Sequence, residues 1–600
     1  MPFGAECLED GSVRFRLWAP QAKKVELCLP SRRGGLIPLA PLPEGWFQLL
    51  SGEASAGSRY KFRIDQKVEV PDPASRFQPS DIHGPSEIVD PAKFDWRDQG
   101  WQGRPWSEAV IYELHVGAFS PEGDFAGVEK RLDYLADLGV TAVELMPLAD
   151  FPGARNWGYD GVLPYAPDGS YGRPEALKTL IQAAHSKGLM VFLDVVYNHF
   201  GPEGNYLRAY APQFFSSRHR TPWGDAINFD GPASRPVRDF FIHNALYWLE
   251  EFHLDGLRLD AVHAIFDSSE PHILTELAET VRNSFGPERQ IHLILENANN
   301  ESRYLGSQAK ASAGWYDAQW NDDIHHALHV LLTGESDGYY SDYSRDPACQ
   351  LGRCLAEGFA FQGEYSPYHH AVRGESSVEL TPSAFVSFLQ NHDQIGNRAF
   401  GERILKFAQP ARLRAAMAIL SLAPSPPLLF MGEEFGAETP FLFFCDFEGD
   451  LAAAVTEGRR GEFARFAEFS SPQARARIPD PNSAATFLAS KLDWDSLSRP
   501  GHAGWLEFYR CLLKLRREAI VPHLPGMPGS TANFRVCADG SLHVNWKLRD
   551  GFSLGLFANL KEDWAGDGGI PQGHWLYASH PSLEDCQRMP PWSVVWMLQS

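Results

Sequence analysis

The sequence predicts an α/β chain built around an eight-stranded (β/α) TIM barrel, with a β-sandwich on either side. Three observations support this prediction. Short alternating runs broken by Pro and Gly fill residues 1–90, apolar runs alternate with helical stretches over residues 109–522, and short strands return in residues 523–600. The outer patterns are typical of small antiparallel sandwiches, and the middle one of parallel βαβ units. A Pro- and Trp-rich linker, residues 91–108, joins the first two regions.

The first region alternates apolar and polar residues with the period of a strand. The runs SVRFRLWAP, KVELCLP and RYKFRID are separated by the turn-forming clusters SRRGG and PLPEG. Side chains two apart in a strand share a face, so each run presents one apolar face to a partner sheet. This pattern predicts the N-terminal sandwich.

The middle region contains eight apolar runs of strand length, with helical candidates between them. The helical candidates are residues 127–139, 174–188, 235–252 and 271–285. An open doubly wound sheet could use the same elements, but no G-x-G-x-x-G follows a strand, so the barrel is the more economical prediction. The predicted strands are residues 110–116, 141–148, 189–199, 255–262, 291–297, 313–320, 383–392 and 426–435.

The last region follows a helical stretch, GWLEFYRCLLKLRREAI, at residues 504–520. Four short apolar runs come after it, TANFRVC, SLHVNWKL, GFSLGLFANL and WSVVWML. They predict a second β-sandwich at the C-terminus.

Composition excludes several classes of partner. The 600 residues are 44% hydrophobic and 22% charged, and the net charge of −22 is spread without long runs. This balance argues against nucleic-acid and anionic-membrane partners and fits a neutral substrate. No apolar leader and no run of about 18 apolar residues appears. The eight cysteines are sparse and form no C-x-x-C pair, which predicts reduced thiols in a cytoplasmic protein. The oligomeric state is left open.

The segment GLRLDAVHAI places two charges in an apolar run. Arg258 and Asp260 are two residues apart, so in a strand they share one face while Leu257 and Leu259 take the other. A structural ion pair at a strand end is one explanation, because buried charges are normally paired. The other is a functional site.

Polar side chains gather at the ends of five central strands, where barrel enzymes place their catalytic groups. Each alone has a structural explanation, such as a loop cap or a satisfied core group. Their shared position at one mouth favours a site. They are Asp194, Asn198 and His199; Arg258, Asp260 and His263; Glu296 and Asn297; Asn321, Asp322 and Asp323; and Asn391, His392 and Asp393.

Three of these groups, Asp260, Glu296 and Asp393, are carboxylates on different strands. Glycoside hydrolysis needs one protonated carboxyl and one ionised carboxylate. The cation of Arg258 favours ionisation of its neighbour Asp260, which suits a nucleophile. Glu296 follows the apolar run LIL and is the better candidate for the proton donor. A divalent cation held by the carboxylates and nearby histidines is the alternative.

The segments DVVYNH, GLRLDAVH, ILEN and FLQNHD resemble, in order and placement, the four signature segments of the α-amylase superfamily of retaining glycosidases. The resemblance implies that Asp260 is the nucleophile, Glu296 the general acid/base and Asp393 the third carboxylate, which binds sugar hydroxyls. It also implies a sugar subsite lined by Arg258, His199 and His392, with Tyr159 stacked on the ring. Trp157 and Trp223 could also stack on sugar, or they could be core aromatics.

A narrower likeness lies in residues 156–174, 320–335, 390–403 and 431–447, which resemble the subfamily acting on maltooligosyl trehalose. It implies this oligosaccharide as the substrate. We hypothesise that the segment NDDIHH, residues 321–326, holds the trehalose leaving group; a capping aspartate followed by ordinary helix is the alternative. The candidate substrate-binding residues are Tyr159, His199, Arg258, His263, Asn297, Asn321, Asp322, Asp323, His325, His326, His392, Gln394 and Asn397.

Near relatives differ at defined positions. Branching enzymes usually carry Glu-Ser-Thr after the acid/base and Ser-His-Asp at the seventh strand, whereas this chain has Glu296-Asn297 and an Asn at 391. We therefore expect hydrolysis, with a transferase or an ordinary amylase as the alternative. A noncatalytic carbohydrate-binding protein would lack at least one of the three carboxylates. His263-Ala264 replaces the Lys-His of many amylases, so we predict no required metal and no cofactor. The run RFRLWAPQAKKVEL resembles the carbohydrate-binding sandwich of branching and debranching relatives.

Overall fold

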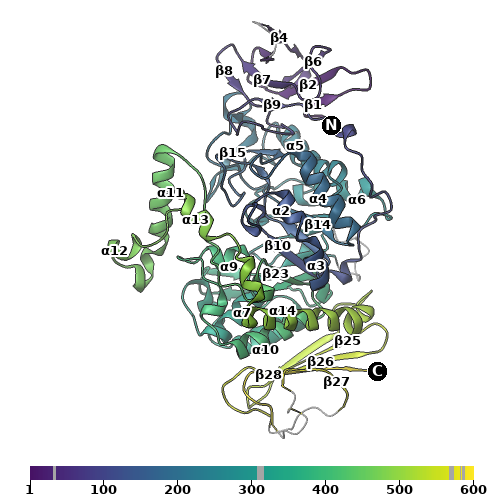
Figure 1. Ribbon diagram of the computed structural model, residues 1–600, viewed down its shortest axis with the longest axis vertical. Coiled ribbons are helices and arrows are strands. Elements are labelled where there is room, and N and C mark those ends of the chain that lie inside the picture. Colours follow the sequence, from purple (N-terminus) through teal and green to yellow (C-terminus); the bar gives the residue numbers. More distant parts are fainter. Residues whose placement is uncertain (31–34, 307–315, 567–572, 581–582, 584–587) are drawn as a thin grey trace.

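The computed structural model describes residues 1–30, 35–306, 316–566, 573–580, 583 and 588–600. Figure 1 shows the N-terminal sheets at one end of the molecule, the barrel in the middle and the C-terminal sheet at the other end. In the part of the chain that the structure describes, no helix is long and apolar enough to cross a membrane.

The N-terminal region forms two antiparallel sheets, as predicted. In β2 (Val13–Trp18), Val13, Phe15 and Leu17 are buried between them, and the ring of Phe15 meets Tyr60 of the other sheet edge-on at 5.0 Å. The first sheet, in order, is β1 (Gly4–Cys7), β2, β6 (Trp46–Ser51) and β5 (Ala40–Pro41). The second is β4 (Leu36–Pro38), β3 (Val25–Cys28), β7 (Arg59–Ile64) and β8 (Val68–Val70), with β9 (Ser86–Glu87) on β7.

The middle region closes into a barrel of eight parallel strands, which confirms the predicted fold class. Every strand lies within its predicted range, although residues 313–315 of the sixth range lie outside the described residues. In barrel order, the strands are β10 (Ile111–Leu114), β11 (Ala142–Leu145), β14 (Met190–Val195), β17 (Gly256–Leu259), β18 (His292–Leu295), β19 (Ala318–Trp320), β22 (Phe385–Phe388) and β23 (Pro427–Phe430).

Helices cover the outside of the barrel and extend its loops. The predicted helical stretches contain α3 (Leu132–Leu138), α4 (Pro174–Ser186) and α6 (Ile273–Phe285), and α5 (Ser234–Glu251) begins one residue before its predicted stretch. The remaining helices are α1 (Val116–Phe119), α2 (Phe125–Glu129), α7 (Asp322–Thr333), α8 (Pro347–Glu357), α9 (His392–Gly396), α10 (Pro410–Leu422), α11 (Gly449–Glu462), α12 (Pro472–Arg475), α13 (Ala484–Ala489) and α14 (Pro500–Leu515). Three two-stranded sheets lie in the loops of the barrel: β12 (Ala149–Asp150) with β13 (Leu163–Pro167), β15 (Phe215–Thr221) with β16 (Gly224–Ile227), and β20 (Glu364–Ser366) with β21 (Ala371–Arg373).

Strand alternation divides the barrel interior into an apolar part and a polar part. Inward residues such as Ile111, Met190 and Phe192 form a separate buried cluster with Trp320. Two positions further along the strands, the inward residues become charged. Glu113, Glu144, Asp194 and Arg258 occupy these positions and are all buried, so the polar layer lies toward the carboxyl ends of the strands.

The C-terminal strands are present, but the described residues form one five-stranded sheet where we expected a sandwich. Helix α8 covers this sheet in place of a second layer: the indole Nε1 of Trp546 donates to the carbonyl oxygen of Leu355 at 3.0 Å. The apolar faces of these strands are therefore buried against helix α8 of the barrel region. The order is β24 (Ala532–Val536), β25 (Leu542–Lys547), β26 (Ser553–Asn559), β28 (Ser593–Gln599) and β27 (Trp575–Ala578).

The predicted linker, residues 91–108, is attached to the N-terminal end of the barrel. Trp101 stacks on His185 with ring centroids 4.8 Å apart, and its Nε1 donates to Asp255 at 2.7 Å. His185 in turn lies between Asp255, at 3.0 Å, and Asp98, at 2.8 Å. We keep the region boundaries at residues 90, 108 and 522 as proposals.

Candidate active site

The guanidinium of Arg258 is the centre of the polar layer. Its Nη1 donates to Asp194 at 2.6 Å and to Asp260 at 2.9 Å. Its Nη2 donates to Glu296 at 2.8 Å, and its planar face lies 4.0 Å from the ring of Trp320. Burial alone would lower the pKa of Arg258, but the surrounding carboxylates raise it well above the ordinary value. A permanent cation thus joins three carboxyl groups.

The two carboxylates predicted to carry out the reaction are held by different donors. Asp260 follows β17, and its Oδ2 accepts from Asn198 Nδ2 at 3.0 Å. Glu296 follows β18, and its Oε2 accepts from the backbone N–H of Ala261 at 2.8 Å as well as from Arg258. The predicted pair of Arg258 with Asp260 is present, and Arg258 contacts Glu296 as well. Among the described residues, nothing donates to Oε1 of Glu296, and that oxygen is available to a proton.

Asp393 lies in the short helix α9, which begins after β22. The Asn391 side chain caps this helix by accepting from the Asp393 backbone N–H at 2.9 Å. The Asp393 side chain is 37% exposed, and its Oδ1 accepts from Asn397 Nδ2 at 3.0 Å. A half-exposed carboxylate on a capped turn is suited to binding hydroxyl groups of a ligand in the cleft.

Tyr159 and His392 connect Asp393 to the Arg258 cluster. The Tyr159 hydroxyl donates to Asp194 Oδ2 at 2.7 Å, and its ring stacks on His392 with centroids 5.1 Å apart. His392 Nε2 lies 3.5 Å from Asp393 Oδ1. The strand ends that carry the predicted site residues therefore meet at one mouth of the barrel.

Glu113, an inward carboxyl, was not among the predicted site residues, and Asp194 was predicted at a strand end but was given no role. Glu113 of β10 contacts His392 Nδ1 at 2.6 Å, and Asp194 of β14 contacts Arg258. Burial, together with the charge of Asp260, raises the pKa of Asp194 to about 7 although Arg258 opposes the shift. Glu113 lies in an otherwise apolar strand, the same signal that drew attention to Arg258, and that signal could have found it.

The segment NDDIHH splits into core residues and cleft residues. Asp323 accepts from the amides of Ala360 and Phe361 and pairs with Arg373 at 2.8 Å. His325 donates from Nδ1 to the carbonyl of Leu389 at 2.6 Å. These contacts, and that of Asn321 Nδ2 with the carbonyl of Gly358, hold Asn321, Asp323 and His325 in the protein interior. Contact of these three residues with substrate stays a prediction.

Asp322 and His326 lie on the other side of the same helix, α7. Burial first, and then the charges of Glu296 and Asp393, raise the pKa of Asp322 to about 8. Asp322 is therefore a neutral acid at neutral pH. Burial lowers the pKa of His326 well below its ordinary value, and its ring packs 4.7 Å from that of Tyr339.

The other predicted contact residues have mixed surroundings. His199 Nε2 donates to the carbonyl oxygen of Tyr159 at 3.1 Å, and burial lowers the pKa of His199 to about 4. His263 Nδ1 accepts from the amide of Ala298 at 3.3 Å. Asn297 is buried and donates to Glu301 at 3.0 Å, and its contact with substrate stays a prediction. Gln394 completes the helix cap with Asn391, its Oε1 accepting from the Asn391 backbone N–H at 3.0 Å.

Two aromatic residues of the predicted mouth behave differently. Trp157 is 4% exposed, stacks on Phe441 at 5.2 Å and donates to the carbonyl of Leu442, so it belongs to the core. Trp223 is 50% exposed and stacks on His199 at 5.0 Å. Of the two, only Trp223 presents a free face to a ligand.

The described residues contain no group of three or more His, Cys, Asp or Glu side chains that could hold a metal ion. What the mouth does contain is a pair of carboxyls held by one guanidinium, with a third, more exposed carboxylate nearby. Such a set can attack an acetal carbon, protonate its leaving oxygen and bind the hydroxyls of the same ring.

Comparisons with known proteins agree with this geometry. Residues 74–245 match the model of the alpha amylase catalytic domain, and residues 2–77 match carbohydrate-binding module 48, the isoamylase N-terminal domain. A malto-oligosyltrehalose trehalohydrolase from Saccharolobus solfataricus is 43% identical over 86% of this chain and 87% of the relative. One from Deinococcus radiodurans is 43% identical over 87% and 84%. A crystal structure of a candidate alpha amylase from Salmonella typhimurium superposes with a TM-score of 0.94 at 44% identity, covering 100% of this chain and 99% of that one.

Proposed function

This chain belongs to the malto-oligosyltrehalose trehalohydrolase family of glycoside hydrolases, and from that premise we propose how it acts. The substrate is maltooligosyl trehalose, and the bond cleaved is the α-1,4-glucosidic bond next to its trehalose end. The products are trehalose and a shorter maltooligosaccharide. The observation that carries the mechanism is the single guanidinium of Arg258 bonded to both Asp260 and Glu296.

The reaction proceeds by two displacements at the same carbon. Asp260 attacks the anomeric carbon while Glu296 gives its proton to the glycosidic oxygen, which leaves on trehalose. Because Oε2 of Glu296 is occupied by Arg258 and Ala261, the proton is carried by Oε1. Glu296, now ionised, takes a proton from water, and the hydroxide attacks the glycosyl ester on Asp260. The maltooligosaccharide leaves with its α configuration retained, and Glu296 is protonated again.

The retaining mechanism requires the carboxyl groups of the nucleophile and the acid/base to lie about 5 to 5.5 Å apart, whereas about 9 Å would suit inversion.

Asp393, on its capped turn, binds hydroxyls of the ring under attack. Tyr159 offers the ring an aromatic face, and His392 and His199 lie beside it. Asp322 and His326 are the members of NDDIHH that we assign to the trehalose leaving group.

The first test is product analysis on maltooligosyl trehalose and on a plain maltooligosaccharide of similar length. Free trehalose, formed much faster than the plain chain is cleaved, is the expected result. Equal cleavage of both substrates would identify a general amylase instead. Longer or branched products would identify a transferase.

We also propose that the protein is cytoplasmic and acts there on maltooligosyl trehalose. The seven cysteines that the structure describes are all unpaired, as expected of a reducing compartment.

A further inference from the structure

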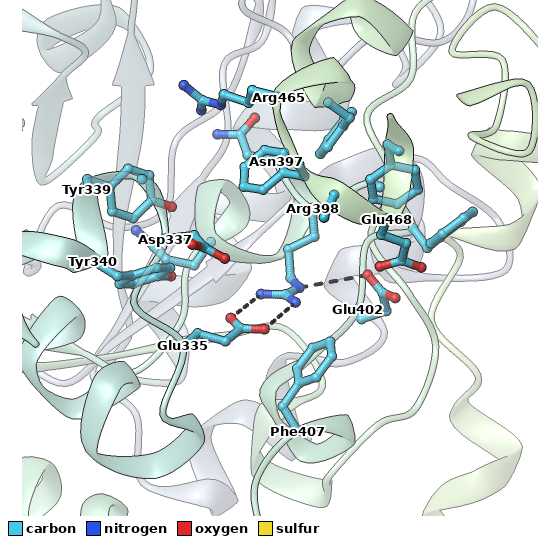
Figure 2. A pocket seen from close by; sticks show the side chains of 18 residues that line it. Glu335, Asp337, Tyr339, Tyr340, Asn397, Arg398, Glu402, Phe407, Arg465 and Glu468 are labelled. Carbon is cyan, nitrogen blue, oxygen red and sulfur yellow. Dashed lines mark hydrogen bonds and ion pairs between the residues drawn. The ribbon is translucent and has the colours of Figure 1, made fainter. Parts of the chain in front are cut away.

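A pocket of about 410 Å³ opens beside Asp393. Three loops supply its walls: residues 335–340 after α7, residues 394–407 after β22, and residues 463–469 after α11. Figure 2 shows Arg398 in its middle, with Tyr339 and Tyr340 on one side and Asn397 and Arg465 above. Its size falls in the range of small-ligand sites, about 300 to 1,000 Å³.

The lining of this pocket combines apolar faces with hydrogen-bonding groups. Tyr339, Phe400, Phe407 and Phe466 contribute partly buried aromatic rings. Asn397, Glu335, Asp337 and the arginines contribute donors and acceptors. A pyranose ring has apolar faces and a rim of hydroxyls, so it needs this mixture.

Contacts within the protein fix the positions of Arg398 and Glu335 in the pocket. Arg398 forms a two-bond contact with Glu335, at 2.9 and 3.0 Å, and lies 4.0 Å from the ring of Phe407. His329 Nε2 also contacts Glu335 Oε2, at 2.7 Å. Fixed donors and acceptors reduce the entropy lost on binding.

The charge of the lining selects against anions. Four carboxylates (Glu335, Asp337, Glu402 and Glu468) surround two guanidiniums (Arg398 and Arg465), and Arg398 is already engaged by Glu335 and lies 3.7 Å from Glu402. A phosphate or a nucleotide would meet net repulsion. A neutral polyhydroxylated ligand would not.

The pocket borders the proposed active site through two contacts. Asn397 lines the pocket and donates to Asp393 Oδ1 at 3.0 Å. Tyr339 lines it too, and its ring packs against His326, the residue next to the cleft. Groups that line the pocket therefore contact residues of the proposed active site directly.

We propose that this pocket is a further subsite for glucosyl units of the substrate, beyond the ring held by Asp393. The proposal rests on the proposed function, because a neutral glucan is the ligand considered. Glucosyl units occur both in the maltooligosaccharide part and in the trehalose end, and the chemistry of the pocket fits either.

The test uses Phe466→Ala in the full-length protein, with Phe552→Ala as a matched control. Phe552 is also partly buried but lies in the C-terminal sheet region. Binding of maltoheptaose and of trehalose is measured by titration calorimetry in a Glu296→Gln background, where the ligand is not turned over. We expect Phe466→Ala to weaken binding of one of these ligands about tenfold, and Phe552→Ala to leave both unchanged.

The ligand whose binding is weakened identifies which part of the substrate occupies the pocket. Weaker binding of maltoheptaose alone assigns the pocket to the maltooligosaccharide part, and KM should then rise more for long substrates than for short ones, with kcat unchanged. Weaker binding of trehalose alone assigns it to the leaving group. Parent-like affinity for both ligands in both Phe466→Ala and Phe400→Ala would overturn the subsite. A parent enzyme that releases no trehalose would refute the proposed function, while the maltoheptaose titration would still report on the pocket.

Discussion

Glu113 and His392, 279 residues apart in the chain, form a buried pair at the mouth of the barrel. Glu113 Oε1 lies 2.6 Å from His392 Nδ1, and Oε2 accepts from the His392 backbone N–H at 3.1 Å. Burial by itself lowers the pKa of His392, but Asp393 and Glu113 outweigh it and raise the pKa to about 9. At neutral pH the imidazolium thus donates from both nitrogens, to Glu113 on one side and toward Asp393 on the other.

Replacing Glu113 by Gln should move the alkaline limb of the pH–rate profile to lower pH. The variant removes a charge that favours the imidazolium, so burial lowers the pKa of His392, and the proton near Asp393 is lost earlier as pH rises. The measurement is kcat/KM against pH for parent and variant, with thermal unfolding of both as the control for folding. An unchanged profile in a folded variant would show that Glu113 does not act through His392.

Arg258→Lys should inactivate the enzyme more than it unfolds it. A lysine has one ammonium and cannot reach three carboxyl groups, so buried carboxylates lose a partner at a cost of about 3 to 5 kcal/mol in the free energy of unfolding. We expect kcat to fall on the order of 100-fold or more. Arg516→Lys is the matched control, because Arg516 is also fully buried but donates to backbone carbonyls such as that of Ser425. Equal activity losses in both variants would mean that the effect is structural.

Asp322 should control the first alkaline transition of activity. With a pKa of about 8, its carboxyl is a hydrogen-bond donor below that pH and becomes an added negative charge near Glu296 and Asp393 above it. Asp322→Asn, which stays neutral, should hold its activity through pH 8, where the parent declines. Asp322→Ala and His326→Ala should be slower than the parent on maltooligosyl trehalose. Parent-like activity in the alanine variants would remove these residues from leaving-group binding.

His185 should make the stability of the linker contact depend on pH. Burial lowers the pKa of His185, but its bonds to Asp255 and Asp98 outweigh burial and raise it. A raised pKa in the folded state stabilises the protein fully below the unfolded value of about 6.5, and this contribution is lost as pH rises through the folded value. The melting temperature of the parent should be lower above neutral pH than below it. This difference should be smaller in His185→Gln. His243→Gln is the control, because burial shifts the pKa of His243 in the opposite direction.

Local patterns were enough to predict the barrel and part of its site. Alternation in GLRLDAVH placed Arg258 and Asp260 on one inward face, because a strand has a period of two wherever it occurs. The same rule could not place Glu113 beside His392, since that contact depends on closure of the barrel next to β23. Nor could it show that helix α8, and not a second sheet, covers the C-terminal strands.

Neighbouring residues in one segment can also differ for reasons that sequence does not contain. Asp322 and Asp323 have the same side chain, but one helical step turns them by about 100°. Asp323 then meets Arg373 and the amides of the segment at residues 360–361, while Asp322 remains near Glu296. These partners of Asp323 lie within residues 360–373, at least 37 residues further along the chain, and no local pattern defines the path of that segment.

The roles of Asp260 and Glu296 can be separated by the anomer formed with added azide. In Glu296→Ala the ester on Asp260 still forms with a good leaving group, and azide attacks it from the free face, so the product is the α-glycosyl azide. In Asp260→Ala azide fills the space of the lost carboxylate and attacks directly, so the product is the β-azide. Both variants should lose on the order of 1,000-fold or more of kcat on the natural substrate. NMR of the azide products decides the assignment: the reverse pairing of anomer and variant would exchange the two roles, and β products from both would indicate that no ester forms on Asp260.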